Sequence, residues 1–176
     1  MSGLQSNLSI RMMALSFSIR DLFIPRLNIL REAGITPESC LLDYGCGSGS
    51  YITPVANLVG PSGRVYALDI QPAAVAMVKG IVKRRGLKNI TIIESDCDTG
   101  LPDNHLDVVL LYDVFHDLKQ PERILAELHR VLKPTGKLSF SDHHLKEKEI
   151  VSSVSEGNYF RLTEQGKKTY TFAPTT

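Results

Sequence analysis

The chain has 176 residues, of which 43% are hydrophobic and 22% charged, and its formal net charge is +1. This length and composition fit one soluble globular domain with a single core. The near-neutral charge argues against a broad nucleic-acid-binding surface, and no apolar stretch approaches the length that a membrane span requires.

The sequence predicts helices and strands that alternate along the chain. Apolar residues at helical spacing, bounded by proline or glycine, predict helices over residues 21–33, 50–59, 72–85 and 121–132. Short apolar runs between these helices predict strands at 40–44, 65–69, 90–94, 107–112 and 137–142. An alternation of this kind predicts a parallel sheet with helices on both faces.

The two ends of the chain differ from its middle. Residues 159–162 and 169–172 alternate polar and apolar side chains around Glu164-Gln165-Gly166, which predicts a hairpin. Residues 1–19 carry apolar side chains outside any predicted strand, so they form either a lid over the site or a disordered terminus. We expect residues 1–176 to form one domain.

The most informative segment is a glycine loop after the first predicted strand. It reads Leu41-Leu42-Asp43-Tyr44-Gly45-Cys46-Gly47-Ser48-Gly49, an apolar run and a carboxylate followed by glycines spaced G-x-G-x-G. Glycines allow positive φ and a close approach of a ligand to the backbone, and a following helix offers free N–H groups. Dinucleotide folds use G-x-G-x-x-G instead. The early third glycine and Asp43 therefore favour a ligand with a cationic head over a pyrophosphate.

This loop resembles the first motif of the class I S-adenosylmethionine-dependent methyltransferases, an apolar strand followed by D-x-G-x-G-x-G. Asp43, Gly45, Gly47 and Gly49 occupy the four defined positions. The resemblance implies a Rossmann-like, doubly wound α/β fold. Its sheet is expected to have seven strands, mostly parallel, with a C-terminal antiparallel hairpin and helices on both faces.

Later landmarks fit the same family. By resemblance, Asp69 at the end of the second strand binds the cofactor ribose, and Ile70 packs on the adenine. Asp96 accepts from the adenine amino group, and the backbone N–H of Cys97 reaches a ring nitrogen. Residues 101–109 resemble the lead into the fourth strand. The predicted cofactor-binding residues are Asp43, Tyr44, Gly45, Cys46, Gly47, Gly49, Asp69, Ile70, Asp96, Cys97 and Tyr112.

Catalytic residues are less clearly marked. His116 follows the fourth strand and is the candidate base, because histidine ionises near neutral pH; a packing or hydrogen-bonding role is at least as common for a histidine in such a loop. Asp142, His143 and His144 could suggest a metal, but adjacent histidines on an extended chain point apart. The three cysteines show no metal or disulfide spacing. No metal site is therefore predicted.

The pattern most resembles the group that includes quinone and sterol methyltransferases. It predicts methyl transfer from S-adenosylmethionine to a small-molecule acceptor, with S-adenosylhomocysteine as product. Two alternatives stay open, a partner or regulatory protein that binds the cofactor without turnover and a nicotinamide-nucleotide oxidoreductase. Unpatterned cysteines and the lack of a signal-peptide pattern lead us to expect a cytoplasmic protein.

Overall fold

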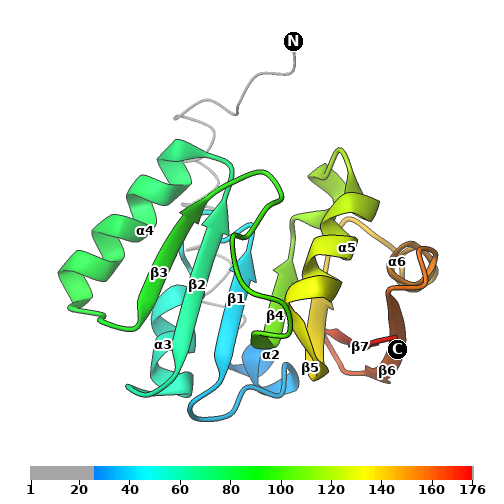
Figure 1. The fold of residues 1–176 in the computed structure, drawn as a ribbon, viewed down its shortest axis with the longest axis horizontal. Helices are drawn as coiled ribbons and strands as arrows, with labels where there is room; N and C mark the ends of the chain where they lie inside the picture. The colour runs from blue at the N-terminus through cyan, green and yellow to red at the C-terminus, as the bar shows by residue number, and fades with distance from the viewer. Residues whose placement is uncertain (1–25, 176) are drawn as a thin grey trace.

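The structure is a computed structural model, and it describes residues 26–175. In this part of the chain seven strands form one sheet (Figure 1). The strands are β1 (Cys40–Tyr44), β2 (Arg64–Asp69), β3 (Ile90–Glu94), β4 (Leu106–Tyr112), β5 (Leu132–Ser141), β6 (Phe160–Gln165) and β7 (Tyr170–Pro174).

The strand order is β3-β2-β1-β4-β5-β7-β6. Strands β1 to β5 pair in parallel. Strand β7 is antiparallel to both of its neighbours and lies between β5 and β6. The predicted doubly wound sheet with a C-terminal antiparallel hairpin is thus confirmed. The chain order reverses between β1 and β4, and ligands bind beyond the carboxyl ends of the strands at such a point.

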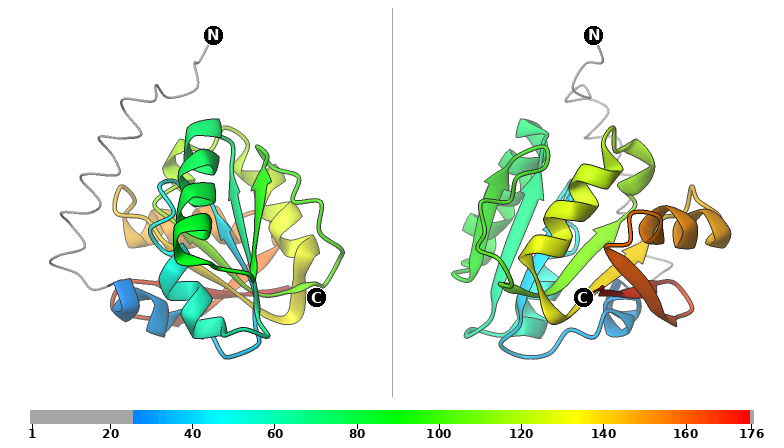
Figure 2. Two further views of the ribbon diagram at one scale, coloured as in Figure 1. Left: turned by 90° about the vertical axis from the view of Figure 1, so that its left-hand side faces the viewer. Right: turned by 45° about the vertical axis from the view of Figure 1, so that its right-hand side comes forward.

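Helices cover both faces of the sheet (Figure 2). One layer holds α2 (Arg26–Glu32), α3 (Ile52–Val59) and α4 (Pro72–Arg85), and the other holds α5 (Pro121–Val131) and α6 (Glu147–Ser155). Successive strand side chains point to opposite faces. Leu41 therefore packs in the core with α2, α3 and α4, whereas its neighbour Leu42 packs in the core with α5 and α6.

Most predicted boundaries lie within two residues of the observed ones. Helix α4 begins and ends as predicted, because Pro72 opens it and Gly86 closes it with φ 64°. Strand β5 differs: the predicted helix included Leu132, and the predicted strand began at 137. Leu132 instead pairs with Leu106, and the register of β5 against β4 then shifts before the pairing resumes. The predicted first helix included residues 21–25, which lie outside the described residues, as does the predicted lid.

Two features of the C-terminal part were not predicted correctly. Helix α6 was missed, because its apolar face is short and only Ile150 and Val154 of its residues are buried. The hairpin turn was placed too early, since β6 continues through Gln165. The turn is instead held by Glu32 of α2, whose carboxylate accepts from the backbone and the hydroxyl of Thr169 at 3.1 and 3.0 Å. Within residues 26–175 no helix has the length and apolar character needed to cross a bilayer.

Candidate functional site

The glycine loop leaves β1 at the carboxyl edge of the sheet. The backbone N–H groups of Gly45 and Cys46 both donate to the carbonyl oxygen of Leu68, at 2.8 and 2.9 Å, so the loop is attached to the end of β2. Its three glycines have φ values of 72°, 51° and 76°. These values lie in the left-handed region that glycine enters without a steric cost. The predicted conformational reason for the glycines is confirmed.

The three glycines do not serve the same purpose. A Cβ atom on Gly45 would lie 2.5 Å from Cγ2 of Val114, and one on Gly49 would lie 2.9 Å from two side chains of α4. Both positions are therefore required by packing within the protein. At Gly47 the nearest atom would be the carbonyl oxygen of Gly45, 3.9 Å away. Of the three, Gly47 is the glycine at which the described residues leave open space where a ligand could lie.

Asp69 holds the loop from the tip of β2. One oxygen of its carboxylate accepts from the N–H of Gly47, and the other accepts from the N–H of Gln71, both at 2.8 Å. Burial raises the pKa of Asp69, and these two hydrogen bonds oppose the rise. Sequence reasoning missed this role in supporting the loop. Each carboxylate oxygen can accept a second hydrogen bond, and the ribose contact stays a prediction.

On the predicted adenine side of the site, some residues are exposed and others already form hydrogen bonds within the protein. Ile70 is 50% exposed, an unusual state for a large apolar side chain, and Asp96 is also exposed. The hydroxyl of Tyr44 donates to the carbonyl oxygen of Asp96 at 2.9 Å and so ties β1 to the loop after β3. The N–H of Cys97 donates to Oγ of Ser95 at 3.3 Å. A contact between Cys97 and a ring nitrogen would require this weak bond to open.

Several predicted binding residues are buried. Asp43 lies within β1, and Tyr112 at the end of β4 has its hydroxyl 2.7 Å from Oγ of Ser139. Burial raises the pKa of Tyr112, so its hydroxyl keeps its proton. Burial likewise raises the pKa of the thiols of Cys46 and Cys97, so both thiols keep their protons near neutral pH and are not reactive nucleophiles. Direct contacts of these side chains with a cofactor stay predictions.

The loop after β3 is fixed to α5 through Glu127. Its carboxylate accepts from the N–H and the hydroxyl of Thr99, at 3.0 and 2.6 Å, and from the guanidinium of Arg130 at 2.7 and 2.8 Å. Burial alone would raise the pKa of Glu127, but the hydrogen bonds from Arg130 and Thr99 outweigh it and lower the pKa to about 2.

A change of Glu127 to glutamine should therefore lower stability in a pH-dependent way. Because the folded-state pKa lies below the ordinary value of 4.5, the carboxylate stabilises the protein fully above pH 4.5. This contribution is lost as the pH falls towards 2. We expect Glu127→Gln to cost about 1–3 kcal/mol at pH 7 and progressively less in acid, measured by urea unfolding. The exposed Glu122 of the same helix supplies the control Glu122→Gln. Equal free energies of unfolding for Glu127→Gln and the wild type at pH 7 would contradict this account.

His116 lies beyond β4, in the 3-10 helix η1 (Phe115–Asp117). Its Nδ1 is 2.8 Å from an oxygen of Asp142, the residue that follows β5. The Asp142 side chain is fully buried, and it also accepts the backbone N–H groups of His116 and His144 at 3.2 and 3.0 Å. The structure thus gives the predicted candidate base a buried carboxylate partner. Sequence reasoning missed the pair, although both residues follow adjacent parallel strands.

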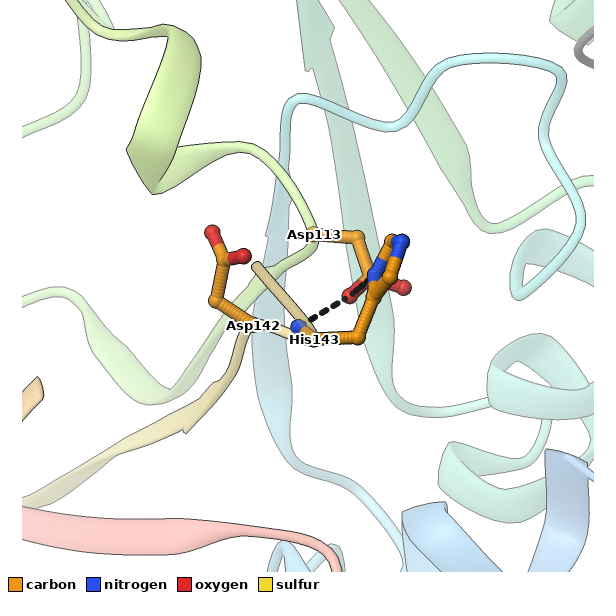
Figure 3. Close-up of side chains that lie close together, drawn as sticks. All are labelled: Asp113, Asp142 and His143. Atoms are coloured by element: carbon orange, nitrogen blue, oxygen red, sulfur yellow. Dashed lines mark hydrogen bonds and ion pairs between the residues drawn. The ribbon is translucent and has the colours of Figure 1, made fainter. Parts of the chain in front are cut away.

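A second aspartate–histidine pair lies beside the first. An oxygen of Asp113 is 2.7 Å from Nδ1 of His143 and 3.2 Å from its backbone N–H (Figure 3). The expectation that adjacent histidines point apart is wrong, since the ring centroids of His143 and His144 are 4.0 Å apart. The reason is that β5 ends at Ser141 and the following residues form a turn.

The same residues form a group of possible cation ligands. One ligand atom each of Asp113, Asp142 and His143 lies within 4.8 Å of the others. Both carboxylates, however, already accept from histidine rings and backbone N–H groups. In Figure 3 the Asp142 carboxylate is turned away from the Asp113–His143 pair. A cation here would have to displace these hydrogen bonds, and the arrangement is better described as two aspartate–histidine pairs.

Comparison with known proteins identifies the family. Residues 35–173 match the family described as "Methyltransferase domain". The chain belongs to this methyltransferase family. The methyltransferase from Aquifex aeolicus described as S-adenosylmethionine dependent has a similar solved structure, with a TM-score of 0.82 and 28% identity, covering 96% of this chain and 98% of that one. This similarity confirms the predicted fold class.

Curated relatives of this methyltransferase chain carry more specific names. It is 31% identical over 112 residues to demethylmenaquinone methyltransferase of Geobacillus stearothermophilus, covering 63% of this chain and 48% of the relative. It is 25% identical over 135 residues to the ubiquinone/menaquinone biosynthesis C-methyltransferase UbiE of a Marinomonas strain, covering 76% and 54%. The chain therefore spans about half the length of the curated relatives it matches.

Proposed function

We propose that this chain binds S-adenosylmethionine, transfers its methyl group to a small-molecule acceptor and releases S-adenosylhomocysteine. The observation that carries the proposal is the open space at Gly47 beside the carboxylate of Asp69. This space lies at the carboxyl edge of the sheet, in a chain that belongs to a methyltransferase family. The near-neutral charge and the relatives' names support a small acceptor rather than a nucleic acid.

The described residues fit this cofactor. Gly47 leaves room beside the backbone for the ribose and the amino-acid part, and the Asp69 carboxylate stands at the tip of β2 for the ribose hydroxyls. The exposed side chain of Ile70 offers an apolar surface to a flat ring, and Asp96 offers a nearby carboxylate. The cofactor supplies a methyl group already activated by a sulfonium. The residues of the chain therefore have to bind, orient and exclude water.

Calorimetric titration of the purified protein with S-adenosylmethionine, S-adenosylhomocysteine and NADH tests the proposal. We expect micromolar binding of the first two ligands and none of NADH. Binding of NADH alone would favour the oxidoreductase and overturn the proposal. If S-adenosylmethionine binds as expected, release of S-adenosylhomocysteine in the presence of an acceptor would exclude the alternative of a protein that binds the cofactor without turnover.

Replacement of Asp69 by asparagine should weaken cofactor binding. The amide keeps the size of the carboxylate but removes the charge and one of the two acceptors that face the Gly47 and Gln71 N–H groups. We expect a loss of about 1–3 kcal/mol in the binding free energy of S-adenosylmethionine, measured by calorimetry. Glu94→Gln at the exposed end of β3 is the control. An Asp69→Asn protein with unchanged affinity would show that this acid does not hold the ribose.

A further inference from the structure

We propose that His116, held by Asp142, takes a proton from the methyl acceptor, and that the acceptor therefore carries an acidic hydroxyl of the phenol or enol class. This inference rests on the proposed function and adds the chemical class of its acceptor. It follows from the burial of one carboxylate, the hydrogen bond that orients one imidazole, and the position of both at the sheet edge that carries the glycine loop.

The hydrogen bonds of Asp142 determine which ring nitrogen of His116 carries the proton. The Asp142 side chain is 0% exposed, and a buried carboxylate has to be compensated by donors. Two of its donors are backbone N–H groups, and the third is Nδ1 of His116 at 2.8 Å. A carboxylate only accepts hydrogen bonds, so Nδ1 bears the hydrogen and Nε2 of the neutral ring is left with its lone pair.

The pair lies beyond the ends of β4 and β5, at the edge of the sheet that also carries the glycine loop. Val114, two residues before His116, packs against Gly45 of the glycine loop. The N–H of Asp113 donates to the carbonyl oxygen of Ser141 at 2.7 Å, which joins the ends of β4 and β5. The His116 side chain is 23% exposed, so a ligand can reach it while Asp142 stays covered. The imidazole is thereby oriented before any substrate binds.

The charged and titratable groups around the ring suit a proton acceptor. Asp142 faces Nδ1, and Oδ2 of Asp117 is 3.7 Å from Nε2, beyond hydrogen-bond distance. The Asp117 side chain is 65% exposed and offers a route for the proton to solvent. The rings of His144 and His143 lie 4.1 and 6.4 Å away between centroids, and Asp113 binds His143. The carboxylates of Asp142 and Asp117 thus both stabilise the His116 imidazolium that forms.

An oriented neutral imidazole selects the kind of acceptor. Amines and thiols supply a good nucleophile with little help, whereas a phenol or enol has to lose its proton to become one. In the proposed step the hydroxyl proton passes to Nε2 of His116. The electron pair of the resulting anion forms the bond to the methyl carbon, from oxygen or from the conjugated carbon. When the carbon of a phenol is methylated, that carbon then loses its own hydrogen as a proton to water, which restores the aromatic ring. The electron pair of the broken carbon–sulfur bond stays on sulfur, and the imidazolium returns its proton to water.

The first test is made on the protein without ligands. Long-range ¹H–¹⁵N NMR of the imidazoles should show the neutral ring of His116 protonated at Nδ1, and Asp142→Asn should change this tautomer. A His116 ring protonated at Nε2 in the wild type would overturn the proposal. This readout needs neither cofactor nor acceptor, so it is distinct from a failure of the proposed function.

The second test compares turnover of 1,4-dihydroxynaphthalene with that of glycine and dithiothreitol. We expect turnover of the hydroxyl compound, reduced about 100- to 10,000-fold in His116→Asn, whose amide can still donate to Asp142. Asp142→Asn should lose about 100-fold or more, and the control His143→Asn, taken from the other pair, should change little. Calorimetry should show unchanged S-adenosylmethionine binding in all variants, which separates this result from loss of the cofactor site.

Three results of the second test would contradict the proposal. One is turnover by His116→Asn within a few-fold of the wild type. Another is a clear preference for the amine or the thiol over the hydroxyl compound. The third is activity that a chelator abolishes and Zn²⁺ restores, with an equal loss in His143→Asn, because it would assign these side chains to a metal centre.

Discussion

Replacing Gly47 with valine is expected to reduce the affinity for S-adenosylmethionine by about 100-fold or more, equivalent to about 2.7 kcal/mol. The new side chain would enter the open space beside the loop, where the nearest atom to a Cβ is 3.9 Å away. That space is the one the cofactor is proposed to occupy. The protein itself should still fold, because the described residues leave room for a Cβ atom at this position. Calorimetry measures the affinity, and thermal unfolding measures the stability.

A matched variant separates the steric effect from backbone strain. Gly86 also has a positive φ, 64°, and it lies at the far end of α4, where none of the described residues comes within 4 Å of its Cβ position. Gly47→Val and Gly86→Val should each lose about 1–2 kcal/mol of stability from the left-handed conformation. Only the first should lose cofactor affinity. Equal affinities in the two variants would mean that the cofactor does not lie over Gly47.

Replacing Gly45 with alanine is expected to cost about 2–5 kcal/mol of stability. The left-handed φ of 72° contributes about 1–2 kcal/mol, and the contact of 2.5 Å with Val114 adds about 1–3 kcal/mol of overpacking. Urea unfolding measures the sum. Because Val114 precedes η1, any relief of the contact moves the segment that carries His116.

The double variant Gly45→Ala, Val114→Ala tests this contact. Removing the two methyl groups of Val114 should return the overpacking part of the loss and leave the strain part. We expect the two changes to be coupled by about 1–3 kcal/mol in a double-mutant cycle. Strictly additive free energies of unfolding would show that Gly45 is needed for its conformation alone. In that case the loop after β4 would be independent of the glycine loop.

Local signals explain why most of the fold could be predicted. Pro72 and Gly86 mark the ends of α4 whatever surrounds them, and the apolar face of α5 follows from its spacing alone. The errors occur where tertiary contacts outweigh local preference. Leu132 suits a helix but pairs with Leu106, and α6 exists because Ile150 and Val154 find the core that Phe160 and Phe172 also enter. The local sequence does not specify such tertiary contacts.

The candidate site shows the same division. Strand order predicts that Asp69 and Asp96 lie at one edge of the sheet, because parallel strands bring their carboxyl ends together. Their cofactor-binding roles were inferred from the resemblance to the methyltransferase family and stay predictions. The hydrogen-bond partners of the site residues could not be predicted. Tyr44 reaches Asp96 across 52 residues of sequence, and His116 reaches Asp142 across 26. Strand order predicts that such ends are neighbours, but the choice of partner depends on side-chain directions in the loops, which the pattern does not specify.

The insertion of β7 between β5 and β6 has a consequence for synthesis of the protein. During translation β5 and β6 leave the ribosome before β7, and the place between them stays empty until residues 170–174 emerge. In that interval β5 has an open edge, and the segment of β6 lacks β7, its strand partner in the described sheet. Unpaired N–H and C=O groups of this kind readily pair with another chain. The nascent protein is then most exposed to exchange of strands with a second copy or to aggregation. Completion of the sheet is thus a late event, in which β7 pairs with β5 and brings β6 into the sheet.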